Sequence, residues 1–114
     1  MELTIEIESA AAVVSSQDTS LDVGNNTGFV DAMVPVMERH RNVVLDMSTI
    51  NFVDSFGLGS IMLLSRRFKT GGGDLKLCGL TAPVVALFEM VRMNRVFDIH
   101  PSRGEALSAF TSES

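Results

Sequence analysis

The chain has 114 residues, 46% of them hydrophobic, and a net charge of −5, so it can form one compact core and is too apolar to be disordered. The acidic excess disfavours nucleic acids and anionic membrane surfaces as partners, because both are bound through positive charge. The lone cysteine, Cys78, excludes an internal disulfide, and the histidines and carboxylates lack metal-ligand spacing. No apolar run is long enough to span a membrane, and the acidic first residues do not resemble a signal peptide. We therefore expect a cytoplasmic protein without a metal or other cofactor.

The first third of the chain predicts two strands, a loop and a helix. Residues 3–7 alternate apolar and polar side chains, which is typical of a half-buried strand. Residues 11–16 predict a second strand, and an antiparallel pairing of the two stays open. The polar residues 17–26 predict a loop. Apolar residues at helical spacing then predict a helix, and Pro35 inside it should kink it.

The middle of the chain alternates strand and helix. The apolar run in residues 42–47 predicts a central strand, followed by a loop over residues 48–54. A helix is predicted from about Ser55 to Thr70, where three consecutive glycines stop it. Residues 75–78 predict the next strand, in which Cys78 is expected to be a small buried side chain.

The last third predicts two helices with a short strand between them. Thr81 should cap the first of these helices, because a proline follows in its first turn. Residues 96–99 predict a short strand, and Ser102 with Glu105 forms a capping-box pattern before the final helix. We expect the domain to occupy residues 1–112 and a short polar tail residues 113–114. The apolar stripe expected on the earlier helix consists of Val84, Val85, Leu87, Phe88 and Val91.

The order of these elements is β-β-α-β-α-β-α-β-α, which predicts a single α/β domain. Alternating strands and helices imply parallel strands joined by crossovers. We expect a mixed sheet of four to five strands packed with about four helices. The pattern leaves open whether the helices cover one face of the sheet or both.

The segment from Phe52 to Gly59 follows a strand and opens a helix, and it carries the most information about function. Asp54 and Ser55 fall at the helix N-terminus, where free N–H groups and the helix dipole favour negative charge. One interpretation is that these residues only cap the helix. The other is that Ser55 accepts a phosphate, which the fold would tolerate but a partner docked at this corner would have to accommodate. Glycines at positions 57 and 59 would permit either close approach by a partner or tight packing on the sheet.

The residues Asp54-Ser55-Phe56-Gly57-Leu58-Gly59 resemble the D-S-x-G-L-G signature of the STAS family, and more narrowly of bacterial anti-sigma-factor antagonists. The neighbouring strands and helices over residues 40–110 fit the same resemblance. Before them, Ser20-Leu21-Asp22 resembles the G-x-L-D loop of the family, with Ser20 in place of the usual glycine. Phe56 also departs from the family, which often has a small residue there, so it should either alter partner specificity or pack under the loop.

The resemblance implies a partner-switching mechanism. The unmodified antagonist would bind an anti-sigma factor that is itself an ATP-dependent serine kinase, and thereby free the sigma factor. Phosphorylation of Ser55 would end the binding, and a serine phosphatase would restore it. The alternative is a STAS adaptor that scaffolds a regulatory assembly and is never phosphorylated. The docking surface expected at this corner, including the exposed side of the helix, comprises Asp22, Asp54, Ser55, Phe56, Gly57, Leu58 and Ser60.

Catalytic alternatives fit the sequence less well. A hydrolase needs a base beside its nucleophile, but His40 and His100 are both distant in sequence from Ser55 and there is no G-x-S-x-G elbow. Asp46 ends a strand, as a receiver phosphoacceptor does, but the companion acidic pair is missing, and a loop-capping carboxylate is expected. The glycine triplet lacks the Lys-Ser/Thr of a P-loop. We therefore expect a binding protein with no catalytic residues.

Overall fold

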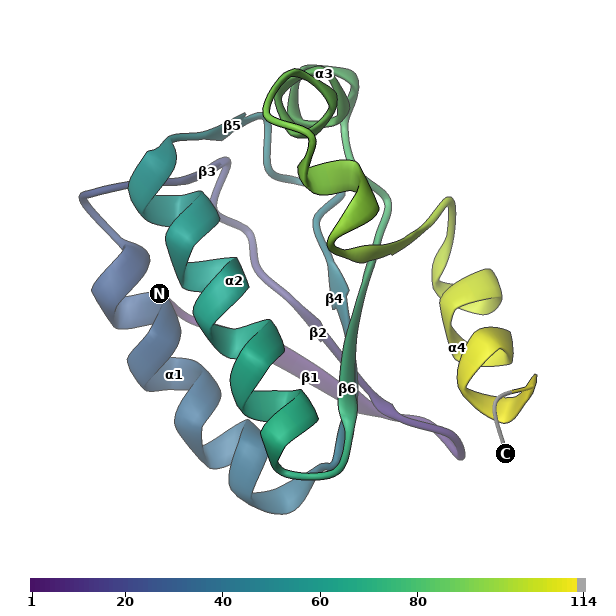
Figure 1. Cartoon of the computed structure of the whole chain (residues 1–114). Helices are drawn as coiled ribbons and strands as arrows, with labels where there is room; N and C mark the ends of the chain where they lie inside the picture. The colour runs from purple at the N-terminus through teal and green to yellow at the C-terminus, as the bar shows by residue number, and fades with distance from the viewer. Residues whose placement is uncertain (113–114) are drawn as a thin grey trace.

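A five-stranded sheet forms the centre of the molecule in a computed structural model that describes residues 1–112 (Figure 1). Its strand order is β1-β2-β4-β6-β7. β1 pairs antiparallel with β2, and all the other neighbours in this sheet are parallel. The predicted mixed α/β fold is thus confirmed, and the opening pair, whose pairing the sequence left open, is antiparallel. The strands are β1 (Thr4–Ile7), β2 (Ala12–Ser15), β4 (Asn42–Asp46), β6 (Asp74–Cys78) and β7 (Asp98–His100).

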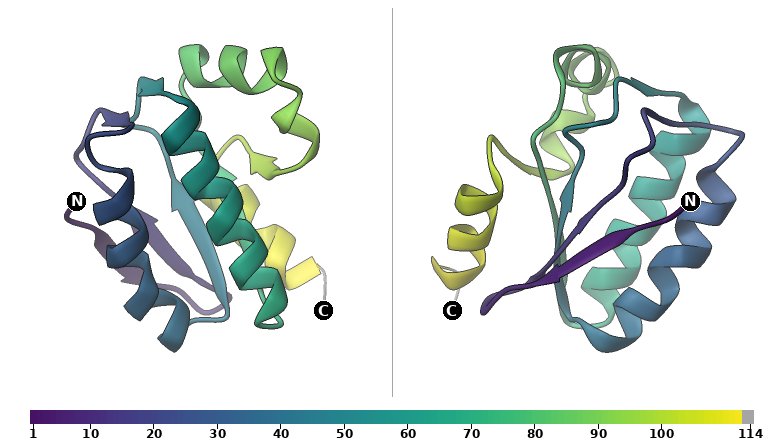
Figure 2. Two further views of the ribbon diagram at one scale, coloured as in Figure 1. Left: turned by 60° about the vertical axis from the view of Figure 1, so that its left-hand side comes forward. Right: turned by 180° about the vertical axis from the view of Figure 1, so that it is seen from behind.

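Helices cover both faces of this sheet, which the sequence left open. α1 (Asn26–Arg39) and α2 (Ser55–Thr70) lie side by side on one face (Figure 1). α4 (Arg103–Ser112) packs on the opposite face, against β4 and β6 (Figure 2). α3 (Ala82–Met90) lies at one end of the sheet, and the short 3-10 helix η1 (Met93–Arg95) leads from it towards β7.

The alternation of side chains along each central strand separates two apolar cores. In β4, Val43 and Leu45 join the large core under α1 and α2. Val44, between them, points to the other face and joins a smaller core with Ala106 and Phe110 of α4. The middle of β4 is apolar on both faces because both faces are covered.

Two short strands form a second sheet inside segments that were predicted as loops. β3 (Ser20–Leu21) and β5 (Phe52–Val53) pair in parallel, with Ser20 opposite Phe52 and Leu21 opposite Val53. Strands of two residues are too short to show a periodicity, so the sequence pattern could not reveal them. Their pairing fixes the segment before α1 beside the N-terminus of α2.

The prediction that the first strand is half-buried was wrong. All four residues of β1 are exposed, including Ile5 and Ile7. β1 is an edge strand, so it has a neighbouring strand on one side only. Alternating apolar residues predict a strand, but they do not show whether a helix covers its apolar face. α1 continues as one helix through Pro35, which is exposed, so the proline does not end the helix. The kink stays a prediction.

The region from α3 to α4 matches the predicted order but not every predicted contact. In α3, Val84 and Phe88 are buried, whereas Val85 and Val91 are exposed, so the expected apolar stripe is narrower than predicted. The last strand begins two residues later than expected because η1 precedes it. One half of the predicted capping box is present, because Ser102 Oγ accepts the Glu105 N–H at 3.3 Å. The Glu105 carboxylate accepts the Ser102 hydroxyl instead of the Ser102 N–H. The predicted tail, residues 113–114, lies outside the described residues, and the domain limits stay a prediction.

Candidate functional site

Asp54 organises the N-terminus of α2 with both oxygens of its carboxylate. Oδ1 accepts hydrogen bonds from the N–H groups of Phe56 and Gly57, each at 2.9 Å. Oδ2 accepts the N–H of Val23 at 3.0 Å. The Asp54 N–H in turn donates to the Leu21 carbonyl oxygen at 3.3 Å. Asp54 is therefore both the helix cap and the link between α2 and the segment that follows β3.

The hydrogen bonds to Asp54 also fix its charge. The Gly57 N–H lowers the pKa of Asp54 most, and the N–H groups of Val23 and Phe56 lower it further, against an opposing effect of desolvation. Donors that face a carboxylate stabilise its ionised form. The carboxylate next to Ser55 is therefore anionic at neutral pH.

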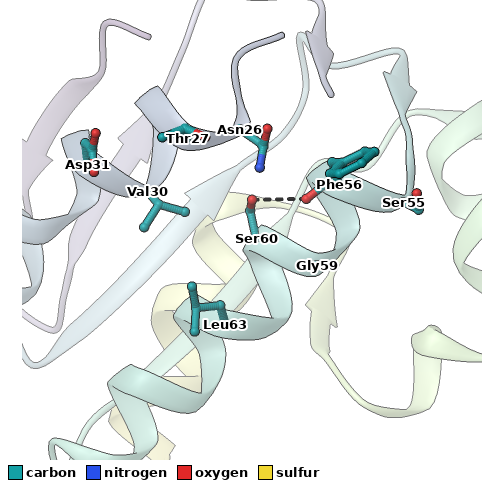
Figure 3. Close-up of a pocket in the computed structure, with 9 residues that line it drawn as sticks. All are labelled: Asn26, Thr27, Val30, Asp31, Ser55, Phe56, Gly59, Ser60 and Leu63. Carbon is teal, nitrogen blue, oxygen red and sulfur yellow. Dashed lines mark hydrogen bonds between the residues drawn. The ribbon is translucent and has the colours of Figure 1, made fainter. Parts of the chain in front are cut away.

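Ser55 is the first residue of α2 and is exposed. Figure 3 shows it at the N-terminal end of the helix, beside Phe56 and at one end of a groove between α1 and α2. The first-turn N–H groups of Phe56 and Gly57 are already bound to Asp54. A charged group attached to Ser55 would thus extend into solvent instead of replacing the helix cap.

The two glycines after Ser55, Gly57 and Gly59, have different surroundings. A Cβ on Gly57 would lie 2.1 Å from the Leu21 carbonyl oxygen, so this glycine allows α2 to pack directly on β3. A Cβ on Gly59 would meet nothing within 4 Å. Of the two interpretations made from the sequence, tight packing thus applies to Gly57. At Gly59 the absent side chain leaves open surface beside the groove.

Asp22 lies in the loop after β3, next to Val23, whose N–H donates to Asp54. Its Oδ2 accepts the Ser20 hydroxyl and its Oδ1 the Gly24 N–H, both at 2.9 Å. Asn25 completes the loop, because its Oδ1 accepts the Asp22 N–H at 2.9 Å. Ser20, which stands where the family usually has glycine, takes part in this network as a donor. The structure thus brings Asp22 and Asp54 to the same corner.

The remaining predicted contact residues differ in exposure. Phe56 is 56% exposed, so it points outward and does not pack under the loop. Leu58 is half-buried and packs against the main core. Ser60 is only 5% exposed, and its hydroxyl donates to the Phe56 carbonyl oxygen at 3.0 Å (Figure 3). The expectation that Ser60 lies on the exposed side of the helix was wrong, because position 60 faces α1.

The contact residues expected from the sequence left out two exposed apolar side chains at this corner. Val23 and Phe52 are large, exposed apolar side chains, and both lie in segments that were predicted as loops. The groove, with a volume of about 420 Å³, was also unforeseen, since it depends on the packing of α1 against α2. It is lined by Asn26, Thr27, Val30, Asp31, Ser55, Phe56, Gly59, Ser60 and Leu63.

The rival sites take structural roles. Asp46 Oδ1 accepts the Ser48 N–H at 2.9 Å, which confirms it as a loop-capping carboxylate, and its Oδ2 pairs with Arg103. Cys78 is buried as expected, and burial, with the nearby charge of Asp46, raises its pKa to about 11. His40 ends α1, about 20 Å along this helix from the end that adjoins Ser55. Among residues 1–112, no cluster of His, Cys, Asp or Glu is arranged to hold a metal, and no helix could cross a membrane.

These features define a class of protein, a small α/β domain that exposes a serine at a capped helix N-terminus beside a short two-stranded sheet. The family model of the STAS domain matches residues 4–106. The chain therefore belongs to the STAS domain family, and the match extends further towards the N-terminus than the resemblance over residues 40–110.

Individual relatives agree with this assignment. BtrV of Bordetella bronchiseptica is 33% identical over 70 residues, which cover 61% of this chain and 60% of BtrV. The anti-sigma-B factor antagonist of Bacillus subtilis is 27% identical over 79 residues, covering 69% of this chain and 72% of the relative. Among solved structures, the anti-sigma factor antagonist SpoIIAA in its unphosphorylated form has a TM-score of 0.76 at 14% identity, with 97% of both chains covered. That structural likeness shows the shared fold.

Proposed function

We propose that this protein is an anti-sigma factor antagonist controlled by phosphorylation of Ser55. The unphosphorylated form binds an anti-sigma factor with serine-kinase activity and so frees a sigma factor. Phosphorylation switches this binding off, and a serine phosphatase reverses it. The protein is then a cytoplasmic binding switch, the substrate of an enzyme and not an enzyme itself. The sequence relationship to the Bacillus subtilis antagonist supports the first part of this proposal.

The observation that carries the proposal is the position of the Ser55 hydroxyl. It is exposed at the start of α2, next to an ionised Asp54 that already binds the first-turn N–H groups. A kinase can reach such a hydroxyl without unfolding the helix. The phosphate would add about −1.5 to −2 charge, and it would stay on the surface because the N–H groups of Phe56 and Gly57 are already bound to Asp54.

A phosphate at this position should oppose binding for two reasons. It lies beside the exposed Phe56, so a partner that covers this side chain would strip water from a dianion, which is costly without a matched countercharge. A kinase partner also holds nucleotide phosphates next to Ser55, and these would repel the phosphoserine. Folding is affected much less, because negative charge at a helix N-terminus is favourable.

The test is phosphosite mapping by mass spectrometry. Wild type and Ser55→Ala are incubated with ATP in lysate of the native cell. Ser60→Ala is the matched control, because it removes a buried serine hydroxyl from the same helix. The proposal expects one phosphate on wild type and on Ser60→Ala, at Ser55, and none there on Ser55→Ala. An unmodified Ser55, in a lysate whose other serine kinases are active, would contradict it and favour the unphosphorylated adaptor.

A further inference from the structure

Three large apolar side chains are exposed around Ser55. Val23 is 64% exposed, Phe52 57% and Phe56 56%. They come from three segments, the loop after β3, the strand β5 and the first turn of α2. Single exposed apolar residues are common, but several gathered at one corner are typical of an interaction site.

The carboxylate of Asp54 holds two of these residues together. It accepts the Val23 N–H on Oδ2 at 3.0 Å and the Phe56 N–H on Oδ1 at 2.9 Å. The backbones of Val23 and Phe56 are thereby fixed to one ionised side chain, although they lie far apart in the sequence. The spacing between their side chains is set before any partner arrives, which lowers the entropy cost of binding.

The pairing of β3 with β5 positions the third apolar residue. Leu21 and Val53 are opposite each other and buried, whereas Phe52, opposite Ser20, points outward. Successive residues of a strand alternate between faces. The two-stranded sheet therefore presents Phe52 on the side away from the core.

The surroundings of these apolar residues are acidic. The segments that form the corner, residues 17–38 and 48–64, contain no lysine or arginine. They contain five acidic residues, Asp18, Asp22, Asp31, Glu38 and Asp54. The arginines and lysine of α1 and α2 lie towards the opposite, C-terminal ends of these helices. Within these two segments the apolar side chains are therefore accompanied by acidic side chains and by no basic side chain.

We propose that Phe56 and Val23 are the apolar anchors of the docking surface, and that Asp54 is the positioning residue that sets their spacing. The partner is a protein with an apolar pocket for these side chains and lysine or arginine groups at the rim that face Asp22 and Asp31. This inference rests on the proposed function for its location, since it concerns the same corner. Aromatic side chains seated in pockets dominate the energy of many interfaces, and rim charges mainly steer association.

The first experiment is photo-crosslinking in the native cell, with benzoylphenylalanine in place of Phe56 or Val23. The same residue in place of Met90 is the control, because Met90 is 79% exposed at the C-terminal end of α3 and does not line the groove beside Ser55. The inference expects positions 56 and 23 to crosslink to one common protein, at neighbouring apolar residues flanked by lysine or arginine. It is overturned if these positions crosslink no protein, crosslink the same set as position 90, or reach a polar or acidic surface.

The second experiment uses the partner that the crosslinks identify, purified without a crosslink. It measures the affinity of this partner for alanine variants of the present protein. Phe56→Ala should weaken binding about 30-fold, as expected for an aromatic hot spot. Phe56→Leu, which keeps an apolar side chain, should recover most of the loss, and Met90→Ala should bind like wild type. Equal affinities for Phe56→Ala and Met90→Ala would overturn the inference.

The positioning role of Asp54 is tested by a double-mutant cycle. Asn and Asp are equally good helix caps, so Asp54→Asn should keep the cap through its amide oxygen. The amide nitrogen cannot accept an N–H, so the variant should lose the hydrogen bond from the Val23 N–H. Asp54→Asn should weaken binding in wild type and have little further effect in Val23→Ala. Additive effects would mean that Asp54 does not act through Val23.

The experiments can contradict the Ser55 switch and the apolar anchors independently of each other. All these affinities can be measured in the Ser55→Ala background, which has no phosphoacceptor at this site. If Ser55 is phosphorylated but Phe56→Ala binds normally, the switch stands and the apolar anchors are overturned. If the crosslinks and affinities follow the prediction but Ser55 is never phosphorylated, the anchors stand and the switch is wrong.

Discussion

Gly57 and Leu21 lie so close that a Cβ built on Gly57 would be 2.1 Å from the Leu21 carbonyl oxygen. This contact seats the first turn of α2 on β3. The closest atoms belong to the backbone, so they cannot yield as the end of a flexible side chain would. The site therefore depends on the absence of a single side chain at position 57.

Gly57→Ala should consequently destabilise the fold, whereas Gly59→Ala should not. We expect Gly57→Ala to cost about 2 to 4 kcal/mol of unfolding free energy, as severe overpacking does. Gly59→Ala should gain up to about 1 kcal/mol, because alanine is the better helix former and its Cβ meets nothing within 4 Å. Urea denaturation of both variants measures the difference. Equal stabilities would show that α2 shifts freely on β3.

Two functions of Asp54, capping α2 and holding the Val23 backbone, should be separable by substitution. Asp54→Ala removes the helix cap and the bond to Val23, so it should cost about 1 to 2 kcal/mol. Asp54→Asn should keep most of the helix stability. Amide hydrogen exchange at Phe56 and Gly57 should rise in Asp54→Ala and stay near wild type in Asp54→Asn, while exchange at Val23 should rise in both. Unchanged exchange at Val23 in Asp54→Asn would contradict this assignment.

Charge at position 55 should affect binding much more than folding. Ser55→Asp and Ser55→Glu place an anion at the positive end of α2, which offsets its repulsion by Asp54. We expect both variants to unfold within about 1 kcal/mol of wild type. Their affinity for the cognate anti-sigma factor should fall at least about tenfold, whereas Ser55→Ala should bind like wild type. Tight binding by Ser55→Asp would support the adaptor instead of the switch.

Acid stability should depend on the pair formed by Arg103 and Asp46, whose Nε and Oδ2 lie 2.5 Å apart. Burial acts to raise the pKa of Asp46, but the hydrogen bonds from Arg103 and Ser48 bring it below its ordinary value. A carboxylate with a depressed folded-state pKa stabilises the fold above its unfolded pKa, near 4, and this contribution is lost as the pH falls through the lower, folded value.

Arg103→Met removes one partner of Asp46 and leaves only the hydrogen bonds from Ser48 to oppose the effect of burial, so the pKa of Asp46 should rise. The variant should be less stable than wild type by about 2 kcal/mol at pH 7, and this gap should narrow as the pH falls below about 4. Denaturation curves over this pH range test it. Glu6→Gln is the control, because Glu6 meets the same arginine at the exposed surface, where ion pairs contribute little. A gap that stays constant with pH would exclude the pair as its source.

The sheet face under α4 contains a buried cation, Lys76, and removing its acidic partner should lower the free energy of unfolding. The side chain of Lys76 is fully buried; it pairs with Asp98 and lies 4.6 Å from the centre of the Phe110 ring. Asp98→Asn should destabilise the protein by about 3 kcal/mol, because it weakens the compensation of a buried charge. Lys76→Met should cost less, since it keeps the stem of the side chain and Asp98 is partly hydrated. The reverse order of stabilities in urea would contradict this account.

The sequence by itself determined the order of the main elements and the place of Asp54 and Ser55 at the start of a helix. The limits of α2, Ser55 to Thr70, follow from signals that act within a few residues: a cap, a helical apolar spacing and a glycine stop. The assignment of Cys78 to the core and of Asp46 to a loop cap also followed from local patterns.

Only the tertiary structure decided how these elements form a site. β3 and β5 pair two residues at a time, so neither is a stable element until the chain brings them together. The bond between Asp54 and Val23 joins positions 31 residues apart, and the burial of Ser60 depends on where α1 packs. Contacts between segments distant in sequence leave no periodic trace, because each depends on the packing of the whole fold. A sequence pattern can therefore locate the serine, but the docking surface proposed around it depends on contacts that exist only in the folded chain.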